Sequence, residues 1–124
     1  MTIKVLAIDD SRTIRTMVHK AMAEAGFDCA LADDGVQGLA RFRDDPPDVV
    51  ITDINMPNLD GYGVITAIRG GEVHRRVPIL VLTTESSPHL KARAREAGAT
   101  GWIIKPFDDE ALVSVVRRVT GMEV

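Results

Sequence analysis

Short apolar stretches alternate with helical patterns along the chain, and this alternation is the feature that most restricts its fold. The stretches 3–8, 48–53 and 78–83 have interiors made almost entirely of aliphatic residues. Such runs are typical of parallel strands that are covered on both faces, whereas a strand with one wet face alternates apolar and polar residues. Two further stretches, 27–32 and 101–105, complete a set of five strands. The pattern predicts an α/β fold with a doubly wound parallel sheet.

Helix signals fill the intervals between the predicted strands. Each interval contains a residue suited to begin a helix, and these residues are Ser11, Asp34, Asp60, Ser87 and Asp108. In the helix after Asp34, apolar spacing predicts an inner face of Val36, Leu39 and Ala40. Spacing alone does not give the strand order, but 2-1-3-4-5 is a common order for such a sheet, with five helices on two faces. This order would place the first and third strands side by side.

The composition is that of one ordinary globular domain spanning residues 1–124. The chain is 45% hydrophobic and 27% charged, and its net charge of −3 argues against nucleic acid or an anionic membrane as the main partner. The single cysteine, Cys29, lies in an apolar stretch and is predicted to be a small core residue. The first apolar run is too short for a signal peptide or a membrane span, so we expect a cytoplasmic protein.

Polar side chains stand where four of the predicted strands end. Asp9 and Asp10 follow the first strand, Asp53 ends the third, Thr83 ends the fourth and Lys105 ends the fifth. Taken singly, each has an ordinary structural explanation, such as an acid in the first turn of a helix or a surface lysine. Ligands of open α/β sheets, however, bind beyond the carboxyl ends of the strands. The set therefore indicates a functional site there.

The residue types at these strand ends favour phosphoryl chemistry. Three carboxylates close together require a cation, and Lys105 supplies only one charge. An all-oxygen donor set suits Mg²⁺, and His19, His74 and His89 are isolated in the sequence. A carboxylate beside Mg²⁺, a lysine and a threonine hydroxyl can attack phosphorus and become an acyl phosphate. Asp53 is the predicted nucleophile.

Together these residues resemble the receiver domain of two-component response regulators, and in particular the single-domain chemotaxis type, CheY. The resemblance covers essentially the whole chain. It rests on Asp9-Asp10, on Asp53-Ile54-Asn55-Met56-Pro57 with Asp60-Gly61, on Thr83, and on Lys105-Pro106-Phe107. It implies a phosphoacceptor signalling protein rather than an enzyme, with autophosphorylation from small donors and autodephosphorylation. Asp53 would take its phosphoryl group from a histidine kinase.

The resemblance also implies the metal ligands. Asp10, Asp53 and the backbone carbonyl of Asn55 would ligate Mg²⁺, and Asp9 would contribute through a water molecule. Lys105 would pair with the phosphoryl group, and its peptide bond to Pro106 is expected to be cis.

Further positions are implied to control switching and its duration. Thr83 would move to the phosphoryl group, and Trp102 would be the switch aromatic where tyrosine or phenylalanine is more usual. Asn55 and Glu85 would flank the attacking water and set the lifetime of the phosphoryl group. Thr84 stands where a smaller residue is common, which would narrow access to the pocket.

The implied output is a binding surface on the fourth helix, the fifth strand and the fifth helix. We expect a basic, aromatic-centred patch there, made of Lys91, Arg95, Trp102 and Arg118. An ordinary solvated face is an equal alternative for the basic residues. The output partner would be a protein such as a flagellar motor switch component, with a phosphatase as a possible further partner. A phosphorelay shuttle or a phosphate sink would use the same residues.

Two other classes of protein share part of this chemistry. Haloacid-dehalogenase-like phosphatases also form an aspartyl phosphate, but their nucleophile follows the first strand and has a second carboxylate two residues on. Here Asp53 follows the third strand and Asn55 stands two residues on. A flavodoxin-like FMN carrier needs a Ser/Thr/Gly-rich phosphate loop after the first strand, where Asp9 and Asp10 would repel a phosphate.

Overall fold

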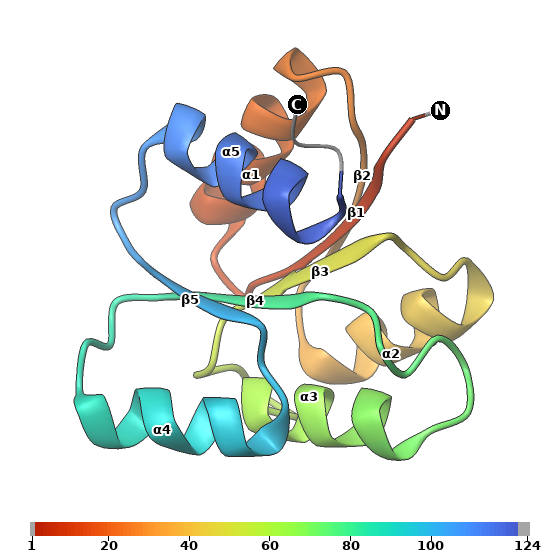
Figure 1. Cartoon of the computed structure of the whole chain (residues 1–124), viewed down its shortest axis with the longest axis vertical. Helices are drawn as coiled ribbons and strands as arrows, with labels where there is room; N and C mark the ends of the chain where they lie inside the picture. The colour runs from red at the N-terminus through yellow and green to blue at the C-terminus, as the bar shows by residue number, and fades with distance from the viewer. Residues whose placement is uncertain (1, 122–124) are drawn as a thin grey trace.

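The computed structural model describes residues 2–121 as a parallel sheet between two layers of helices (Figure 1). The elements are, in chain order, β1 (Lys4–Ile8), α1 (Arg12–Glu24), β2 (Asp28–Ala32), α2 (Gly35–Asp44), β3 (Val49–Thr52), α3 (Gly61–Gly70), β4 (Ile79–Thr83), α4 (Pro88–Ala97), β5 (Gly101–Ile104) and α5 (Asp109–Val119). The five strands lie in the order β2-β1-β3-β4-β5. The predicted fold class and strand order are confirmed.

The strand register brings the carboxyl ends of the strands to one edge of the sheet. Ile8 pairs with Thr52 across β1 and β3, and the N–H of Asp53 donates to the carbonyl of Ile8 at 3.0 Å. At the other side, the N–H of Lys105 donates to the carbonyl of Thr83 at 2.8 Å. The residues that directly follow these strands therefore lie close together at this edge of the sheet.

Two hydrophobic cores lie on the two faces of the sheet. Helices α1 and α5 cover one face, and α2, α3 and α4 cover the other (Figure 1). Alternate residues of β1 enter opposite cores, since Leu6 packs with the α2–α4 side and Val5 with the α1–α5 side. Every residue of β3 and β4 is buried, which explains their uninterrupted apolar sequences.

Side-chain caps begin four of the five helices, as the sequence predicts. The acceptors are Ser11 of α1, Asp34 of α2, Asp60 of α3 and Asp108 of α5, each accepting from a backbone N–H two or three residues on. Helix α4 differs, because Ser87 makes no side-chain cap bond and Pro88 occupies the first turn.

The predicted inner face of α2 is wrong at two of its three positions. Val36 is 56% exposed and Ala40 is also exposed, while Leu39 is buried with Phe42. The helix turns Gly38 toward β1, and a Cβ atom there would collide with the side chain of Ile8. Because glycine adds nothing to an apolar pattern, the sequence did not reveal that this side of the helix packs closest.

The prediction for Cys29 is only partly confirmed. Its side chain packs against the α1–α5 core but is partly exposed, because β2 is an edge strand. Burial raises the pKa of this thiol to about 12. Between residues 2 and 121, no helix is both long enough and apolar enough to cross a bilayer.

Candidate functional site

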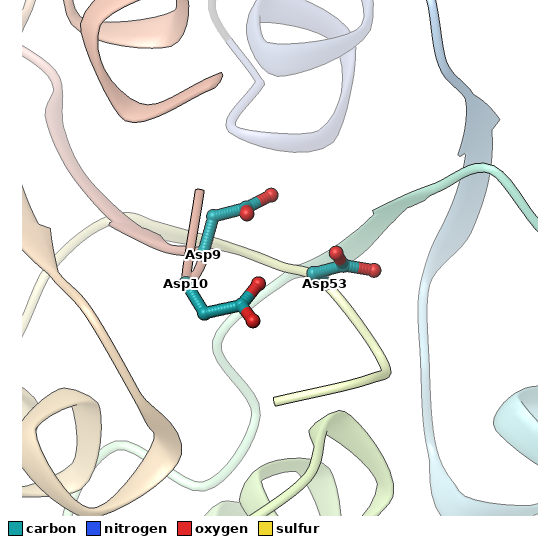
Figure 2. Close-up of side chains that lie close together, drawn as sticks. All are labelled: Asp9, Asp10 and Asp53. Atoms are coloured by element: carbon teal, nitrogen blue, oxygen red, sulfur yellow. The ribbon is translucent and has the colours of Figure 1, made fainter. Parts of the chain in front are cut away.

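Three carboxylates meet at the carboxyl edge of the sheet. Each of Asp9, Asp10 and Asp53 offers an oxygen that lies within 4.8 Å of the others (Figure 2). Asp9 and Asp10 come directly after β1, and Asp53 directly after β3, so the pairing of these strands creates the cluster. Asp9 is 4% exposed and Asp53 is 9% exposed, whereas Asp10 is exposed. The cluster is therefore open to solvent on the Asp10 side.

Lys105 enters the cluster from β5. Its Nζ donates to Oδ2 of Asp9 at 2.7 Å and to Oδ2 of Asp53 at 2.9 Å. Burial alone would lower the pKa of Lys105, but the two carboxylates outweigh it and raise that pKa. Burial also raises the pKa of Asp9, although its bonds to Lys105 and to the backbone of Ser11 oppose the change. The single positive charge of Lys105 does not neutralise the negative charge of the three carboxylates.

Backbone groups fix the orientation of the two buried carboxylates. Oδ1 of Asp53 accepts from the N–H of Ile54 at 2.7 Å, and Oδ1 of Asp9 accepts from the N–H of Ser11 at 2.9 Å. The guanidinium of Arg15 donates to the carbonyl of Asp9 at 2.6 Å, which holds the start of the β1–α1 connection. Sequence reasoning missed Arg15; its position on α1, one turn after the cap Ser11, was the available signal.

The donor set fits a hard divalent cation. Three carboxylates and one ammonium group leave an excess of two negative charges when all are ionised, and close like charges are unfavourable without a counter-ion. Carboxylate oxygens are the ligands that Mg²⁺ takes, and the exposed Asp10 leaves room for water ligands. Asn55 is exposed two residues beyond Asp53, and the part predicted for its carbonyl stays a prediction.

A chain of hydrogen bonds links Thr83 to Trp102. Thr83 ends β4 and is buried, and its Oγ1 accepts from the N–H of Glu85 at 3.3 Å. The carbonyl of the same Glu85 accepts from the indole N–H of Trp102 at 3.0 Å. The backbone of Glu85 thus lies between the predicted switch threonine and the predicted switch aromatic. Thr84 is exposed, and its predicted effect on access stays a prediction.

The peptide bond between Lys105 and Pro106 is cis, as predicted.

The residues predicted for partner binding lie only partly together. Lys91, Arg95 and Trp102 line one small hollow between α4 and β5. Arg118 is exposed on α5 and does not line that hollow. The structure therefore groups three of the four residues predicted for partner binding, and their role stays a prediction.

Comparison with known proteins settles the family. The model of the response regulator receiver domain matches residues 5–117 of this chain. The chain belongs to the response regulator receiver family. This receiver domain is 33% identical over 115 residues to the protein PilG of Pseudomonas aeruginosa, covering 93% of the chain and 85% of PilG. It spans only about half of other curated relatives, such as the response regulator MprA of Mycobacterium tuberculosis, of which it covers 50%.

Solved structures agree with this assignment. The chemotaxis protein CheY4 of Vibrio cholerae superimposes with a TM-score of 0.91 at 42% identity, covering 96% of this chain and 99% of CheY4. The receiver domain of the sensor histidine kinase PA1611 from Pseudomonas aeruginosa PAO1 superimposes with a TM-score of 0.90 at 27% identity, covering 98% and 99% of the two chains. That receiver holds a magnesium ion in its active site cleft. The chain is thus a CheY-like receiver of two-component signalling.

Proposed function

We propose that this receiver domain is a phosphorylation-activated switch in which Asp53 accepts a phosphoryl group from a histidine kinase. The observation that carries the proposal is the cluster itself, in which a nearly buried Asp53 shares Lys105 with Asp9. A carboxylate oxygen of Asp53 forms the new O–P bond while the N–P bond of the kinase's phosphohistidine breaks. The imidazole nitrogen keeps the electron pair of that bond, and the product is an acyl phosphate.

Mg²⁺ is the proposed cofactor. When bound, it would neutralise charge on the transferring phosphoryl oxygens. Asp10, Asp53 and the carbonyl of Asn55 are the proposed ligands, with Asp9 acting through a water molecule. The excess negative charge of the cluster supports this assignment, as does the magnesium ion in the related PA1611 receiver.

Lys105 and Thr83 would receive the phosphoryl group. The Nζ of Lys105 already lies 2.9 Å from Oδ2 of Asp53, so it is placed to bind an oxygen of a phosphoryl group carried by Asp53. The hydroxyl of Thr83 would donate to another phosphoryl oxygen. Movement of Thr83 toward the site would strain its 3.3 Å bond from the N–H of Glu85 and so disturb the contact of Glu85 with Trp102.

The proposed output surface is the face of α4, β5 and α5. Lys91 and Arg95 are exposed beside the partly buried Trp102, with Arg118 on the neighbouring α5. These residues suit an output protein with acidic and apolar groups, such as a flagellar motor switch component. Asn55 and Glu85 are proposed to set the lifetime of the phosphoryl group, alone or with a phosphatase.

Labelling with acetyl phosphate tests the phosphoacceptor assignment. We expect the domain to incorporate one phosphoryl group in the presence of Mg²⁺, and to lose this labelling after Asp53→Asn or after removal of divalent ions with a chelator. The matched control is Asp48→Asn, because Asp48 is exposed at the opposite edge of the sheet, where it accepts from the N–H of Lys4. Labelling that persists in Asp53→Asn, or that needs no divalent ion, would contradict the proposal.

A further inference from the structure

Arg69, in the last turn of α3, binds three backbone carbonyls that belong to two other segments. Its Nε donates to Gly98 at 3.0 Å, and its Nη1 donates to Arg75 and Val77 at 2.6 Å each. No ion pair to a carboxylate involves Arg69 within residues 2–121. Burial lowers the pKa of this guanidinium. A charged side chain therefore joins the end of α4 to the segment that enters β4.

The contact at Gly98 explains how this charge is accommodated. Gly98 is the C-cap of α4, where unpaired carbonyls carry partial negative charge that favours a cation. The residue has a φ of 115°, and a Cβ atom built there would lie 2.8 Å from Cγ of Arg69. The planar fork of arginine reaches several acceptors at once, which the point charge of lysine does not. The side chain of Arg69 thus packs directly against Gly98 at the end of α4 and leaves no room for a larger residue there.

Toward its other end, α4 accepts one longer hydrogen bond from Tyr62, and Arg93, further along the helix, lies over the Tyr62 ring at 3.9 Å from its centroid. Ser87 provides no side-chain cap, and Ala94 is the only buried residue of the helix. The hydroxyl of Tyr62 donates to the carbonyl of Leu90, but at 3.3 Å this is longer than any of the three bonds of Arg69. Helix α4 begins at Pro88, three residues after Glu85, whose backbone contacts both Thr83 and Trp102.

We propose that Arg69 is the pivot of α4, a positioning residue that fixes the C-terminal end of the helix while its N-terminal end follows the segment around Glu85. The direction of the signal rests on the proposed phosphorylation of Asp53, whereas the anchoring of α4 does not. With a rise of about 1.5 Å per residue, Lys91 lies roughly 10 Å along the helix from Gly98 and Arg95 about 5 Å. A rotation about this pivot displaces Lys91 about twice as far as Arg95, which reshapes the hollow beside Trp102.

Amide hydrogen exchange, followed residue by residue by NMR, tests the anchoring without any ligand. The N–H of Lys91 donates to the carbonyl of Ser87 at 3.1 Å and that of Ala99 to the carbonyl of Ala94 at 2.9 Å, so these two amides start from similar bonds, whereas the N–H of Gly98 is shared between the carbonyls of Ala94 and Arg95. We expect exchange at Gly98 and Ala99 to be at least about tenfold slower than at Lys91. Arg69→Met should abolish this difference, and Arg69→Lys should restore only part of it.

Arg75→Met is the matched control, because Arg75 offers Arg69 only its backbone carbonyl and its own side chain is exposed. If Arg69→Met gives the same exchange pattern as Arg75→Met, Arg69 is not the anchor. If the unsubstituted protein already exchanges equally fast at both ends of α4, the pivot is refuted without any variant. If Arg69→Met does not fold, the exchange rates of the unsubstituted protein and of Arg69→Lys still test the pivot.

A second arm adds beryllofluoride, a phosphoryl mimic, with Mg²⁺. Fluorine NMR first reports whether the mimic binds, and absence of binding counts against the proposed function while leaving the anchoring result intact. With the mimic bound, we expect amide shifts to be large at Lys91 and small at Gly98 and Ala99. Arg69→Met should spread these shifts along the whole helix. Shifts at Gly98 as large as those at Lys91 in the unsubstituted protein would overturn the pivot.

Discussion

The strand-end cluster and helix α4 lie on the same small domain but are built in opposite ways. At the cluster, every buried carboxylate is bonded to backbone or to Lys105, and the central strands β3 and β4 are fully buried. Helix α4 buries one residue and has no side-chain cap. A site that must align an incoming phosphoryl group benefits from preorganised charges. A surface that must change its shape is drawn from the least stable part of a fold.

The largest expected effect comes from removing the charge that balances the cluster. Lys105→Met leaves Asp9 and Asp53 buried without their shared partner, so we expect the free energy of unfolding to fall by about 3–5 kcal/mol in a chelator. Mg²⁺ should restore part of this loss, because a cation can replace the missing charge. Urea unfolding with and without Mg²⁺ measures both effects. Unchanged stability in both conditions would contradict the coupling of Lys105 to Asp9 and Asp53.

Two leucine truncations compare the two regions directly. Leu80→Ala empties a fully buried position of β4, where the loss of unfolding free energy should be about 3–4 kcal/mol. Leu90→Ala removes a partly buried side chain of α4 and should cost about 1 kcal/mol, because solvent already reaches that site. Urea unfolding of both variants gives the comparison. Equal losses would mean that α4 is packed as firmly as the central sheet.

The fluorescence of Trp102 should report coupling between the regions. It is the only tryptophan, and its indole N–H is bonded to the carbonyl of Glu85 next to the switch threonine. Beryllofluoride with Mg²⁺ should therefore change the intensity or the emission maximum, and Asp53→Asn should abolish the change. A binding signal by fluorine NMR with an unchanged emission spectrum would contradict the switch role of Trp102.

The smallest effect concerns the edge strand β2, which belongs to neither region. Burial raises the pKa of Cys29 from 9.0 to about 12, so at pH 8 about one thiol in ten thousand is ionised. Iodoacetamide should modify the native protein far more slowly than the protein in urea. Because the folded pKa is the higher one, this group stabilises the fold below about pH 9 and loses that contribution as the pH rises toward 12. Rapid modification of Cys29 in the native protein would mean that β2, like α4, is loosely packed.

Regular features of the sequence predicted most of the fold. The buried strands β3 and β4 carry uninterrupted apolar runs, and caps such as Asp34 and Asp60 mark where helices begin. The prediction of the inner face of α2 was wrong because Gly38 packs inward, and a glycine contributes no apolar side chain to the sequence pattern. Ser87 resembles a cap in the sequence, but its side chain makes no cap bond.

The members of the cluster were predictable because they follow strands whose ends share one edge of the sheet. The convergence of Asp9, Asp10 and Asp53 needed only the pairing of β1 with β3. The three bonds of Arg69 had no such signal, since their acceptors are carbonyls scattered over residues 75–98. Side chains that bind backbone leave little trace in a sequence, because every residue type offers the same carbonyl.

The most direct test of Asp53 as the phosphoacceptor is to locate the phosphoryl group on the chain. Borohydride reduces an aspartyl phosphate to homoserine, which peptide mass spectrometry can place at a single residue. After treatment with acetyl phosphate and Mg²⁺, we expect homoserine at position 53, and none when Mg²⁺ is withheld or Asp53 is replaced by asparagine. Homoserine at position 9 or 10, or a phosphoryl group that survives borohydride on a serine or threonine, would contradict the assignment of Asp53 as the phosphoacceptor.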